Sequence, residues 1–431
     1  MDIRNITVNG LFKTFEHKID FSNGDIKIII GENGIGKTAV LRILDAVFNK
    51  NHQALYSIVF DSITIDFTTK NEKWTITKET DKNDNLIRIQ SNLHKKDDQI
   101  IHVITKNVFP RRFFMRIGEN EWIDRHLDVV VSREDIMNRY GIDITNDTTD
   151  NEKDWYSRRL SENQIKLINA QRLFQQKKEG RDDNSFQETV SVYSQALVDI
   201  LKKNDTDFST TSQKLDGSFA NRLLKALNKN KKSKSNPDFD GILNKLKVLS
   251  DYRSKLSKVG VIAQEKDEVI QNLDFIDSNI ITVLSLYVDD NTEKLECYKD
   301  TADKLSILLN IINHRFKYKR IAVDKTKGFV AKSNNDDKSD DNADCIPVNM
   351  LSSGEQNELI MFYDLLFNCD SKDLVLIDEP EISLHLKWQQ SLIEDLRSIC
   401  KTNNISLLIA THSPDIIGDN WNLVQTLSGK E

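Results

Sequence analysis

Continuous apolar runs near the two ends of the chain follow the pattern of buried β-strands. Residues 26–30 form one such run, which leads directly into glycine, and residues 374–377 and 406–410 form two more. Each run is followed by sequence with helical spacing of its apolar positions. Buried runs that alternate with helices are typical of a parallel sheet covered on both faces. The two ends therefore predict one α/β domain.

Alternating patterns predict a second, antiparallel sheet in the first third of the chain. Residues 3–8 alternate like a strand, and residues 56–105 contain several segments rich in Ile, Val, Thr and Phe. Polar turns break these segments at residues 70–73, 82–85 and 94–98. Strand-like segments at this spacing indicate an antiparallel meander.

The middle of the chain has a helical pattern. No proline occurs in the 126 residues between Pro110 and Pro237, which favours long helices. Apolar positions spaced by three and four residues are Leu295, Tyr298, Ala302, Leu305, Leu309, Ile312 and Phe316. This spacing suits a helix in a bundle or a short coiled-coil hairpin, and it does not separate the two.

We therefore expect an α/β head with a mixed sheet, an antiparallel β lobe and a helical insertion that forms a bundle or a short coiled coil. Residues 1–175 would form the N-terminal part of the head, and residues 321–431 its C-terminal part. Residues 176–320 would form the insertion, used for oligomerisation or partner binding. A polar, acidic stretch at residues 146–154 looks like a boundary near the end of the first part.

Composition narrows the classes of function. The 67 acidic and 60 basic residues give a net charge of −7, so no global positive field draws the chain onto nucleic acid. The four cysteines have neither zinc-knuckle nor disulfide-framework spacing and indicate reduced thiols. The start lacks a signal peptide, and no apolar stretch is long enough to span a membrane. We expect a cytoplasmic protein with no membrane partner.

A phosphate-binding loop follows the first buried run. Residues 31–38 read GENGIGKT and fit the pattern GxxxxGK[ST] between a strand and a helix. Glycines let backbone N–H groups approach phosphates, Lys37 would bridge the β- and γ-phosphates, and the Thr38 hydroxyl would bind Mg²⁺. The nucleotide-binding positions expected in this loop are Gly31, Asn33, Gly34, Gly36, Lys37 and Thr38.

Acidic residues and a histidine follow the other two buried strands. Asp378 and Glu379 end the run at residues 374–377, and His412 follows the run at residues 406–410. At the carboxyl edge of a parallel sheet, Asp378 would bind the metal and Glu379 would polarise the attacking water. His412 at the same edge would sense the γ-phosphate.

A second anion site is expected at the start of the helical stretch at residues 357–367. The preceding residues 351–356 read LSSGEQ, which would place backbone N–H groups and hydroxyls at a helix N-terminus. An ordinary helix cap would look the same. Because the chain already has one phosphate loop, this second site would serve a nucleotide on another subunit.

These motifs together resemble the ABC-type ATPase family, which contains SMC, RecF and overcoming-lysogenization-defect proteins. Residues 31–38 match its Walker A motif, residues 351–356 its signature motif, and residues 374–379 its Walker B motif. The resemblance implies ATP and Mg²⁺ as ligands and a switch role for His412. It also implies nucleotide contacts in trans from Ser352, Ser353, Gly354 and Glu355, so that ATP joins two heads.

Gln171 looks like the Q-loop glutamine of this family, which contacts the metal and the attacking water; a polar residue that starts a helix would look the same. Residues 379–389, EPEISLHLKWQ, are similar to ATPases of bacterial anti-phage systems, such as the AriA ATPase of PARIS and the PtuA ATPase of Septu. Residues 109–112 and 170–173 are also similar to segments of these anti-phage ATPases. Residues 383–385 lack the D-loop aspartate of transporters, which argues against transporter-like coupling.

The resemblance implies a sensor and scaffold ATPase of an anti-phage system. It would form a homodimer or higher homo-oligomer through ATP-bridged heads, and it would hold a separate TOPRIM or HNH nuclease or toxin until a phage-encoded trigger acts. Only 19 residues follow His412, so we expect no fused TOPRIM nuclease. The alternative is a RecF- or SMC-like repair ATPase that binds DNA through basic segments such as residues 229–234 or 314–320. The acidic net charge favours the first hypothesis.

Overall fold

The computed structural model divides the chain into two compact units. The first unit comprises residues 1–189 and 360–431, and the second comprises residues 190–359. The structure describes residues 2–21, 24–81, 84–95, 98–103, 114–116, 121–124, 129–132, 155–176, 186–230, 239–263, 278–333, 345–382 and 384–428.

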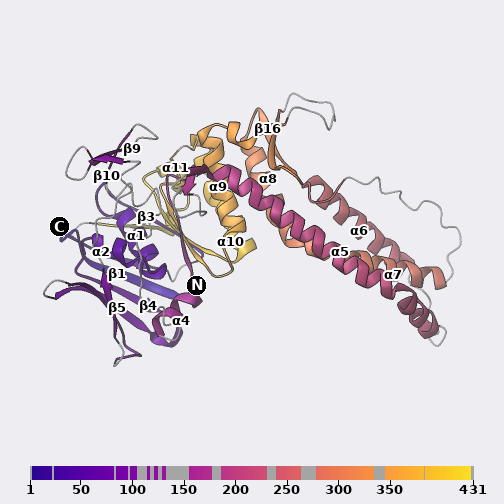
Figure 1. The fold of residues 1–431 in the computed structure, drawn as a ribbon, viewed down its shortest axis with the longest axis horizontal. Helices are drawn as coiled ribbons and strands as arrows, with labels where there is room; N and C mark the ends of the chain where they lie inside the picture. The colour runs from indigo at the N-terminus through magenta and orange to yellow at the C-terminus, as the bar shows by residue number, and fades with distance from the viewer. Residues whose placement is uncertain are drawn as a thin grey trace. The chain divides into compact units, whose positions relative to one another are not determined.

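A five-stranded parallel sheet forms the centre of the first unit (Figure 1). In sheet order its strands are β11 (Ile165–Ile168), β17 (Leu374–Asp378), β18 (Ser406–Ala410), β3 (Ile26–Ile30) and β19 (Val424–Thr426). Helix α1 (Lys37–Phe48) packs on β11, β17 and β18, and α10 (Leu386–Asn403) connects β17 to β18. The predicted parallel strands are confirmed, and their bounds match the apolar runs closely because these strands are buried on both faces. The expected mixed sheet is not seen among the described strands, because parallel and antiparallel strands form separate sheets.

An antiparallel sheet of six strands forms the β lobe of the same unit. In sheet order its strands are β2 (Phe15–Asp20), β1 (Ile3–Leu11), β4 (Ser62–Phe67), β5 (Lys73–Asp81), β6 (Asp84–Ser91) and β7 (Gln99–Val103). The predicted meander is confirmed, but it starts at Ser62, because Tyr56 lies in α2 (His52–Ser57). The Asn51 side chain caps that short helix by accepting a hydrogen bond from the Ala54 N–H.

Aromatic residues fill the core between this sheet and its helices. Trp74 is completely buried and meets Phe67, Trp155 and Tyr156 at ring centroid distances of 4.9 to 5.5 Å. Trp155 and Tyr156 come from α4 (Trp155–Glu162). The Tyr156 hydroxyl donates a hydrogen bond to the Val47 carbonyl at the end of α1. This contact ties the β lobe's aromatic core to the helix that follows the phosphate loop.

The first unit also has several smaller elements. These are η1 (Thr69–Asn71), β8 (Phe114–Arg116), β9 (Glu121–Asp124), β10 (Val129–Ser132), β12 (Phe174–Gln176), β13 (Phe186–Glu188), α11 (Pro414–Ile417) and η4 (Trp421–Leu423). Strands β8, β9 and β10 form one antiparallel sheet, and β12 pairs with β13.

The second unit is mainly helical. Its helices are α5 (Thr189–Asn230), α6 (Phe239–Lys258), α7 (Ser278–Leu295), η2 (Glu296–Tyr298), α8 (Lys299–Arg315), η3 (Val348–Met350) and the start of α9 (Ser353–Phe367), which continues into the first unit. A small antiparallel sheet consists of β14 (Lys319–Asp324), β15 (Gly328–Ser333) and β16 (Ile346–Pro347). The helical insertion is therefore confirmed.

The apolar pattern of the middle segment forms a buried face, although the helix is interrupted. Of its seven positions only Leu309 is half-buried, and the others are buried. The pattern crosses from the end of α7 through the 3₁₀ turn η2 into α8. The Arg222 guanidinium of α5 pairs with the Asp290 carboxylate of α7, which is almost fully buried, and fastens these two helices together.

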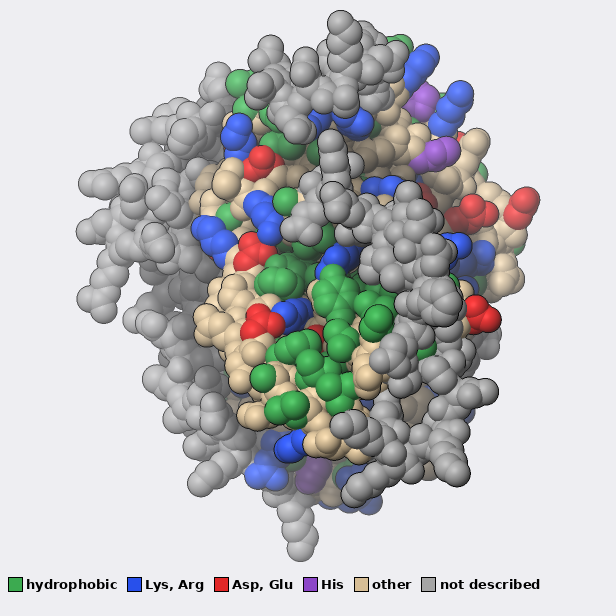
Figure 2. Space-filling model, turned by 90° about the vertical axis from the view of Figure 1, so that its right-hand side faces the viewer, with side chains coloured by type: hydrophobic (Ala, Val, Ile, Leu, Met, Phe, Trp, Pro, Cys, Tyr) green, Lys and Arg blue, Asp and Glu red, His purple; other side chains and the backbone are tan. Residues whose placement is uncertain are grey.

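Exposed apolar side chains gather on the three long helices of this unit. They are Leu224 of α5, Leu243 and Val248 of α6, and Ile280, Val283 and Tyr287 of α7. Figure 2 shows hydrophobic side chains grouped on one face of the molecule. Exposed apolar groups of this kind often mark protein interaction surfaces.

The compact units and the expected functional parts differ in their boundaries. The units change at residues 189/190 and 359/360, whereas the sequence analysis placed boundaries at residues 175/176 and 320/321. The hairpin β14–β15 belongs to the second unit because the Ser194 hydroxyl of α5 accepts a hydrogen bond from the Phe329 N–H. The division into functional parts stays a prediction. Within the described ranges, we find no helix whose length and apolarity would suit a membrane span.

Candidate functional site

The carboxyl edge of the parallel sheet brings the main predicted site residues of the first unit together. Because β3, β17 and β18 are adjacent and parallel, the residues after each strand meet at one edge. The loop at residues 31–38 follows β3, Asp378 and Glu379 end β17, and His412 follows β18. Residues 340 positions apart in sequence therefore become neighbours.

The loop at residues 31–38 wraps tightly around the start of α1. Gly34 and Gly36 have φ angles of 85° and 101°, in the left-handed region that glycine adopts without strain. Gly36 is the N-cap of α1, and a Cβ atom there would lie 2.5 Å from the Leu11 Cδ2 atom. The loop can therefore point backbone N–H groups outward at the N-terminus of α1, where the helix dipole favours an anion.

Lys37 lies across its own loop. Its Nζ atom donates to the Gly31 carbonyl at 2.8 Å and lies 3.3 Å from the His412 Nδ1 atom. Burial lowers the pKa of the Lys37 ammonium, and the nearby carboxylates of Glu379, Asp378 and Glu381 partly oppose this shift. An ammonium held among carboxylates and carbonyls is a compact point charge suited to phosphate oxygens.

His412 faces the Lys37 ammonium with one ring nitrogen. Since Lys37 can only donate, the Nδ1 atom is the acceptor in this contact, and the proton of the neutral ring is assigned to Nε2. The side chain of His412 is otherwise exposed. This arrangement leaves an N–H group available to donate to an anion at the sheet edge.

Thr38 and Asp378 form the candidate metal-binding pair. The Thr38 hydroxyl donates to the Asp378 Oδ1 atom at 3.1 Å. Burial raises the pKa of Asp378 to about 6; the hydrogen bond from Thr38 lowers it, and the charge of Glu379 raises it. A hydroxyl and a carboxylate are hard oxygen donors of the kind that Mg²⁺ takes together with nucleotide phosphates. The two residues therefore fit a magnesium ion.

Glu379 has an unusual backbone conformation. Its φ angle is 44°, a value that residues other than glycine seldom adopt. The Glu379 N–H donates to the Ala410 carbonyl, and the Ile382 N–H donates to the Glu379 carbonyl, so hydrogen bonds on both sides maintain this turn. Such strain is concentrated at functional sites. The turn at Glu379 changes the direction of the chain sharply just after the end of β17.

Glu381 belongs to this edge, although the sequence analysis gave it no role. Its Oε1 atom accepts hydrogen bonds from the Thr411 hydroxyl and from the His412 N–H, both at 2.8 Å. The Ser413 hydroxyl, in turn, donates to the Gln389 side chain at 2.6 Å. The strand-end segment that carries His412 is thus anchored to the loop after β17. No local pattern in residues 379–381 indicated this role, because the two hydrogen-bond partners lie 30 and 31 positions away in sequence.

The signature segment lies in the second unit, where a reciprocal cap starts α9. The Ser352 N–H and hydroxyl donate to the Glu355 Oε2 atom at 2.8 and 2.9 Å, and the Glu355 N–H faces the Ser352 hydroxyl at 3.4 Å. This is the pattern of a capping box. The Lys319 ammonium also contacts the Glu355 carboxylate at 3.0 Å. Burial would raise the pKa of Glu355, but these hydrogen bonds lower it overall.

The cap leaves part of the segment free for other contacts. Ser352 and Ser353 are exposed, and Gly354 is half-buried. Glu355, in contrast, uses its carboxylate to organise the helix start, which suggests a positioning role beside its predicted role in nucleotide binding. The buried Arg315 guanidinium of α8 pairs with the carboxylate of Glu358, which lies in α9 three residues after Glu355. The helix start is therefore held rigidly within its unit.

The remaining predicted residues have simpler outcomes. Gln171 is exposed and lies three residues beyond the end of β11, the neighbour of β17, so it occupies the same sheet edge. Its proposed contact with metal and water stays a prediction. Residues 109–112, Ser383 and most of the basic segment at residues 229–234 lie outside the described residues.

Part of the chain is similar to a known protein. Over an aligned segment of 88 residues, the chain is 35% identical to the Retron Ec83 probable ATPase of Escherichia coli. That segment covers 18% of this chain and 16% of the length of the relative.

Two solved structures cover almost the whole chain at low similarity. The SMC head domain from Pyrococcus furiosus, with an extended coiled coil bound to the C-terminal domain of ScpA, covers 100% of this chain and 96% of its own, with a TM-score of 0.38 and 12% identity. The SMC head domain from Thermotoga maritima covers 99% and 95%, with a TM-score of 0.35 and 10% identity.

A family model described as the AAA ATPase domain matches residues 1–417, which contain every residue assigned to the site above. The match spans nearly the whole chain and implies that the chain binds ATP. The chain therefore belongs to the AAA ATPase domain family.

Proposed function

We propose that the chain binds and hydrolyses ATP with Mg²⁺ in a composite site that two copies share. The observation that carries the proposal is the convergence of Lys37, Thr38, Asp378 and His412 at one sheet edge. Ser352, Ser353 and Gly354 of a second copy would complete the site. Phosphoryl transfer requires charge neutralisation and a positioned water more than covalent chemistry, and this set of groups supplies the charge neutralisation.

Each residue at the edge has a distinct role in this proposal. The loop N–H groups and the Lys37 ammonium bind the phosphates, and Thr38 and Asp378 hold the metal ion. The metal ion, when bound, offsets charge on the β- and γ-phosphates. Glu379 orients the attacking water, and the His412 N–H donates to the γ-phosphate. Gln171 approaches the same water from the β11 side.

A Glu379→Gln variant tests the core of this proposal. The amide keeps the shape of the side chain but does not accept the proton of the attacking water, so ATP should bind and persist. We expect turnover to fall by at least about a hundredfold, and ATP should convert the variant into a stable dimer measurable by light scattering. Unchanged turnover would show that Glu379 is not the water-orienting residue.

Lys37→Ala serves as the matched control for that experiment. Removing the ammonium takes away the main cation of the loop, so nucleotide affinity should fall and ATP should no longer produce a dimer. The two variants therefore separate binding from hydrolysis. Retained ATP affinity in Lys37→Ala would place the phosphates elsewhere.

We further propose that the ATP state controls a separate effector in a bacterial anti-phage system. Support comes from the local similarity to a retron probable ATPase and from residues 379–389, which resemble the PARIS and Septu ATPases. The exposed apolar side chains of α5, α6 and α7 offer a surface for a protein partner. In this proposal the effector is a TOPRIM or HNH nuclease or a toxin, and a phage-encoded protein triggers its release.

A repair ATPase that binds DNA across the ATP-bridged dimer is the second candidate. His314 and Arg320 are exposed, as a phosphate contact from this segment requires. Gene neighbourhood separates the two candidates: an adjacent nuclease gene supports the defence role, and a replication or repair operon contradicts it. Direct DNA binding should weaken steeply with salt, and a salt-insensitive association would exclude phosphate contacts.

A further inference from the structure

An open groove in the second unit has no role in the ATP site. It lies along α6, the turn at residues 259–263, α8 and the hairpin β14–β15, and its volume is about 1550 Å³. We call it the helical-unit groove. Typical small-molecule sites occupy about 300 to 1,000 Å³, so this groove has room for a ligand of nucleotide size.

Cationic side chains dominate the lining of the groove, although the chain as a whole carries a net charge of −7. The lysines and arginines that line it are Arg253, Lys255, Lys258, Arg320, Lys325 and Lys332. Among the described residues that line the groove, Asp251 is the only one with a carboxylate. Charge of one sign in a concave surface focuses the electrostatic field and attracts counter-ions.

Neighbouring acids neutralise only part of this charge. Lys255 pairs with Asp303 at 2.5 Å, and Lys325 pairs with Asp205 at 2.9 Å. With Asp251, three carboxylates of the described residues therefore oppose six cations. The C-termini of α6 and α8, which end at Lys258 and Arg315, each contribute about half a negative charge. A surplus of about two positive charges remains.

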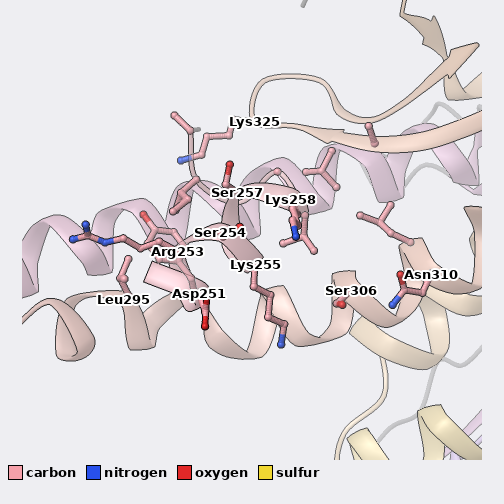
Figure 3. A pocket seen from close by; sticks show the side chains of 18 of the residues that line it. Asp251, Arg253, Ser254, Lys255, Ser257, Lys258, Leu295, Ser306, Asn310 and Lys325 are labelled. Carbon is pink, nitrogen blue, oxygen red and sulfur yellow. The ribbon is translucent and has the colours of Figure 1, made fainter. Parts of the chain in front are cut away.

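Three of the cations account for this surplus. Among the described residues, Lys258, Arg320 and Lys332 have no carboxylate within ion-pair distance. In the view of Figure 3, Lys258 lies between Lys325 of the hairpin and Asn310 of α8. Lys258 comes from α6, whereas Arg320 and Lys332 are paired across the hairpin β14–β15. The fold therefore brings these three cations into the lining of one groove.

The rest of the lining combines hydrogen-bonding and apolar groups. Ser254 and Ser257 of α6 and Ser306 of α8 present hydroxyls, a side-chain type that commonly accompanies Lys and Arg around phosphate oxygens. Val259 and Ile321 are buried apolar residues in the lining near the end of α8, and they form an apolar wall. A ligand that suits both parts has a dianionic group at one end and a flat apolar ring at the other.

We infer that the helical-unit groove binds a nucleotide, separate from the ATP of the sheet edge. Its phosphates contact Lys258, Arg320 and Lys332, and its base lies against the wall formed by Val259 and Ile321. A surplus of about two positive charges matches the charge of a phosphate monoester. A nucleic-acid strand needs an extended basic stripe, whereas this charge is confined to one concavity.

Fluorescent mant derivatives of ADP, GDP, CDP and UDP test this inference in the full chain carrying Lys37→Ala. That background removes binding at the phosphate loop, so a remaining site can be titrated alone. We expect saturable binding of at least one of the four, with one molecule per chain. Failure of all four to bind would overturn the inference.

Charge reversal identifies the groove as the site. Lys258→Glu combined with Lys332→Glu should lower the affinity at least about tenfold, the effect of losing hydrogen bonds to a charged group. Arg320→Glu, a single change at an exposed position, should lower it independently. Lys247→Glu is the matched control, because Lys247 is exposed on the same helix α6 but does not line the groove. It should change the affinity less than twofold.

Two outcomes would contradict the assignment even if a mant nucleotide binds. The first is an affinity that both charge-reversal variants leave unchanged while circular dichroism shows them folded. The second is displacement of the nucleotide by a single-stranded oligonucleotide of about 12 residues, or by poly-glutamate, at lower concentrations than unlabelled nucleotide. The former result would place the site elsewhere, and the latter would make the groove a nucleic-acid or acidic-peptide surface.

Discussion

At the residue scale, burial makes the Asp378 carboxyl harder to ionise than a carboxyl in water, even before a nucleotide binds. Water solvates a carboxylate better than the protein interior does, so the pKa of Asp378 rises from 3.8 to about 6. The ionised Asp378 carboxylate at the sheet edge therefore lowers the free energy of unfolding, and this is its cost to the folded chain. A metal ion would remove that cost, which links occupancy of the site to stability.

Replacing Asp378 with asparagine should therefore stabilise the nucleotide-free chain. Because the folded pKa lies above the unfolded value, the cost is absent below about pH 4 and fully present above about pH 6. Asp378→Asn should gain about 2 kcal/mol at pH 8 and almost nothing near pH 4. Urea unfolding in EDTA at both pH values measures this, and an equal gain at both would contradict the burial argument. ATP turnover should be lost in the same variant.

Glu381 gives a second prediction at this scale. Its Oε1 atom accepts hydrogen bonds from Thr411 and from the His412 backbone, so Glu381→Ala should release the segment that carries His412. We expect kcat to fall about tenfold with little change in KM, the pattern of lost positioning. Glu381→Gln keeps an acceptor oxygen and should retain most activity. If both variants lose activity equally, the charge of Glu381, not its hydrogen bonds, is what the site needs.

The sequence predicted the chemistry of the site better than its supports. Lys37, Thr38, Asp378 and His412 were identified because each follows a buried strand, and parallel strands end at one edge. Glu381 escaped notice because its role depends on the fold of the turn after β17. Its two hydrogen bonds span about 30 residues of sequence, and no local pattern indicates them.

At the element scale, the start of α1 depends on one glycine. Gly36 combines a φ angle of 101° with a close approach to Leu11, so any side chain is both strained and crowded there. Gly36→Ala should destabilise the chain by about 1–3 kcal/mol and weaken ATP binding, as measured by thermal unfolding and nucleotide titration.

Gly217 provides the matched control for that substitution. It lies within α5, with open space where a Cβ atom would be. Gly217→Ala should stabilise the chain by about 0.5–1 kcal/mol, because alanine loses less backbone entropy in a helix. Equal destabilisation by both alanine variants would mean that neither geometry explains the effect.

Elements differed in how well the sequence predicted them. The buried strands were predicted almost to the residue, because short, continuous apolar runs followed by glycine or polar residues have few other interpretations. The hairpin β14–β15 was missed. Its placement with the helical unit depends on contacts such as Ser194 with Phe329, which are 135 residues apart.

At the scale of the whole molecule, the proposed composite site would make each copy dependent on another. The phosphate loop and the signature segment lie in different compact units, and the proposal assigns them to different nucleotides. Ser353 is the residue of choice for testing this. It is exposed at the start of α9, whereas Ser352 and Glu355 form the cap, so Ser353→Arg should block the signature without unfolding the helix.

Mixing two inactive variants then separates a site in trans from a site within one chain. Lys37→Ala supplies an intact signature, and Ser353→Arg supplies an intact phosphate loop. In an equal mixture about half of the dimers pair one copy of each, and each such pair has one intact site of two. We therefore expect about a quarter of the wild-type ATP turnover, from components that are each inactive alone. A mixture that stays inactive, although co-purification of differently tagged copies shows mixed dimers, would contradict a nucleotide shared between copies.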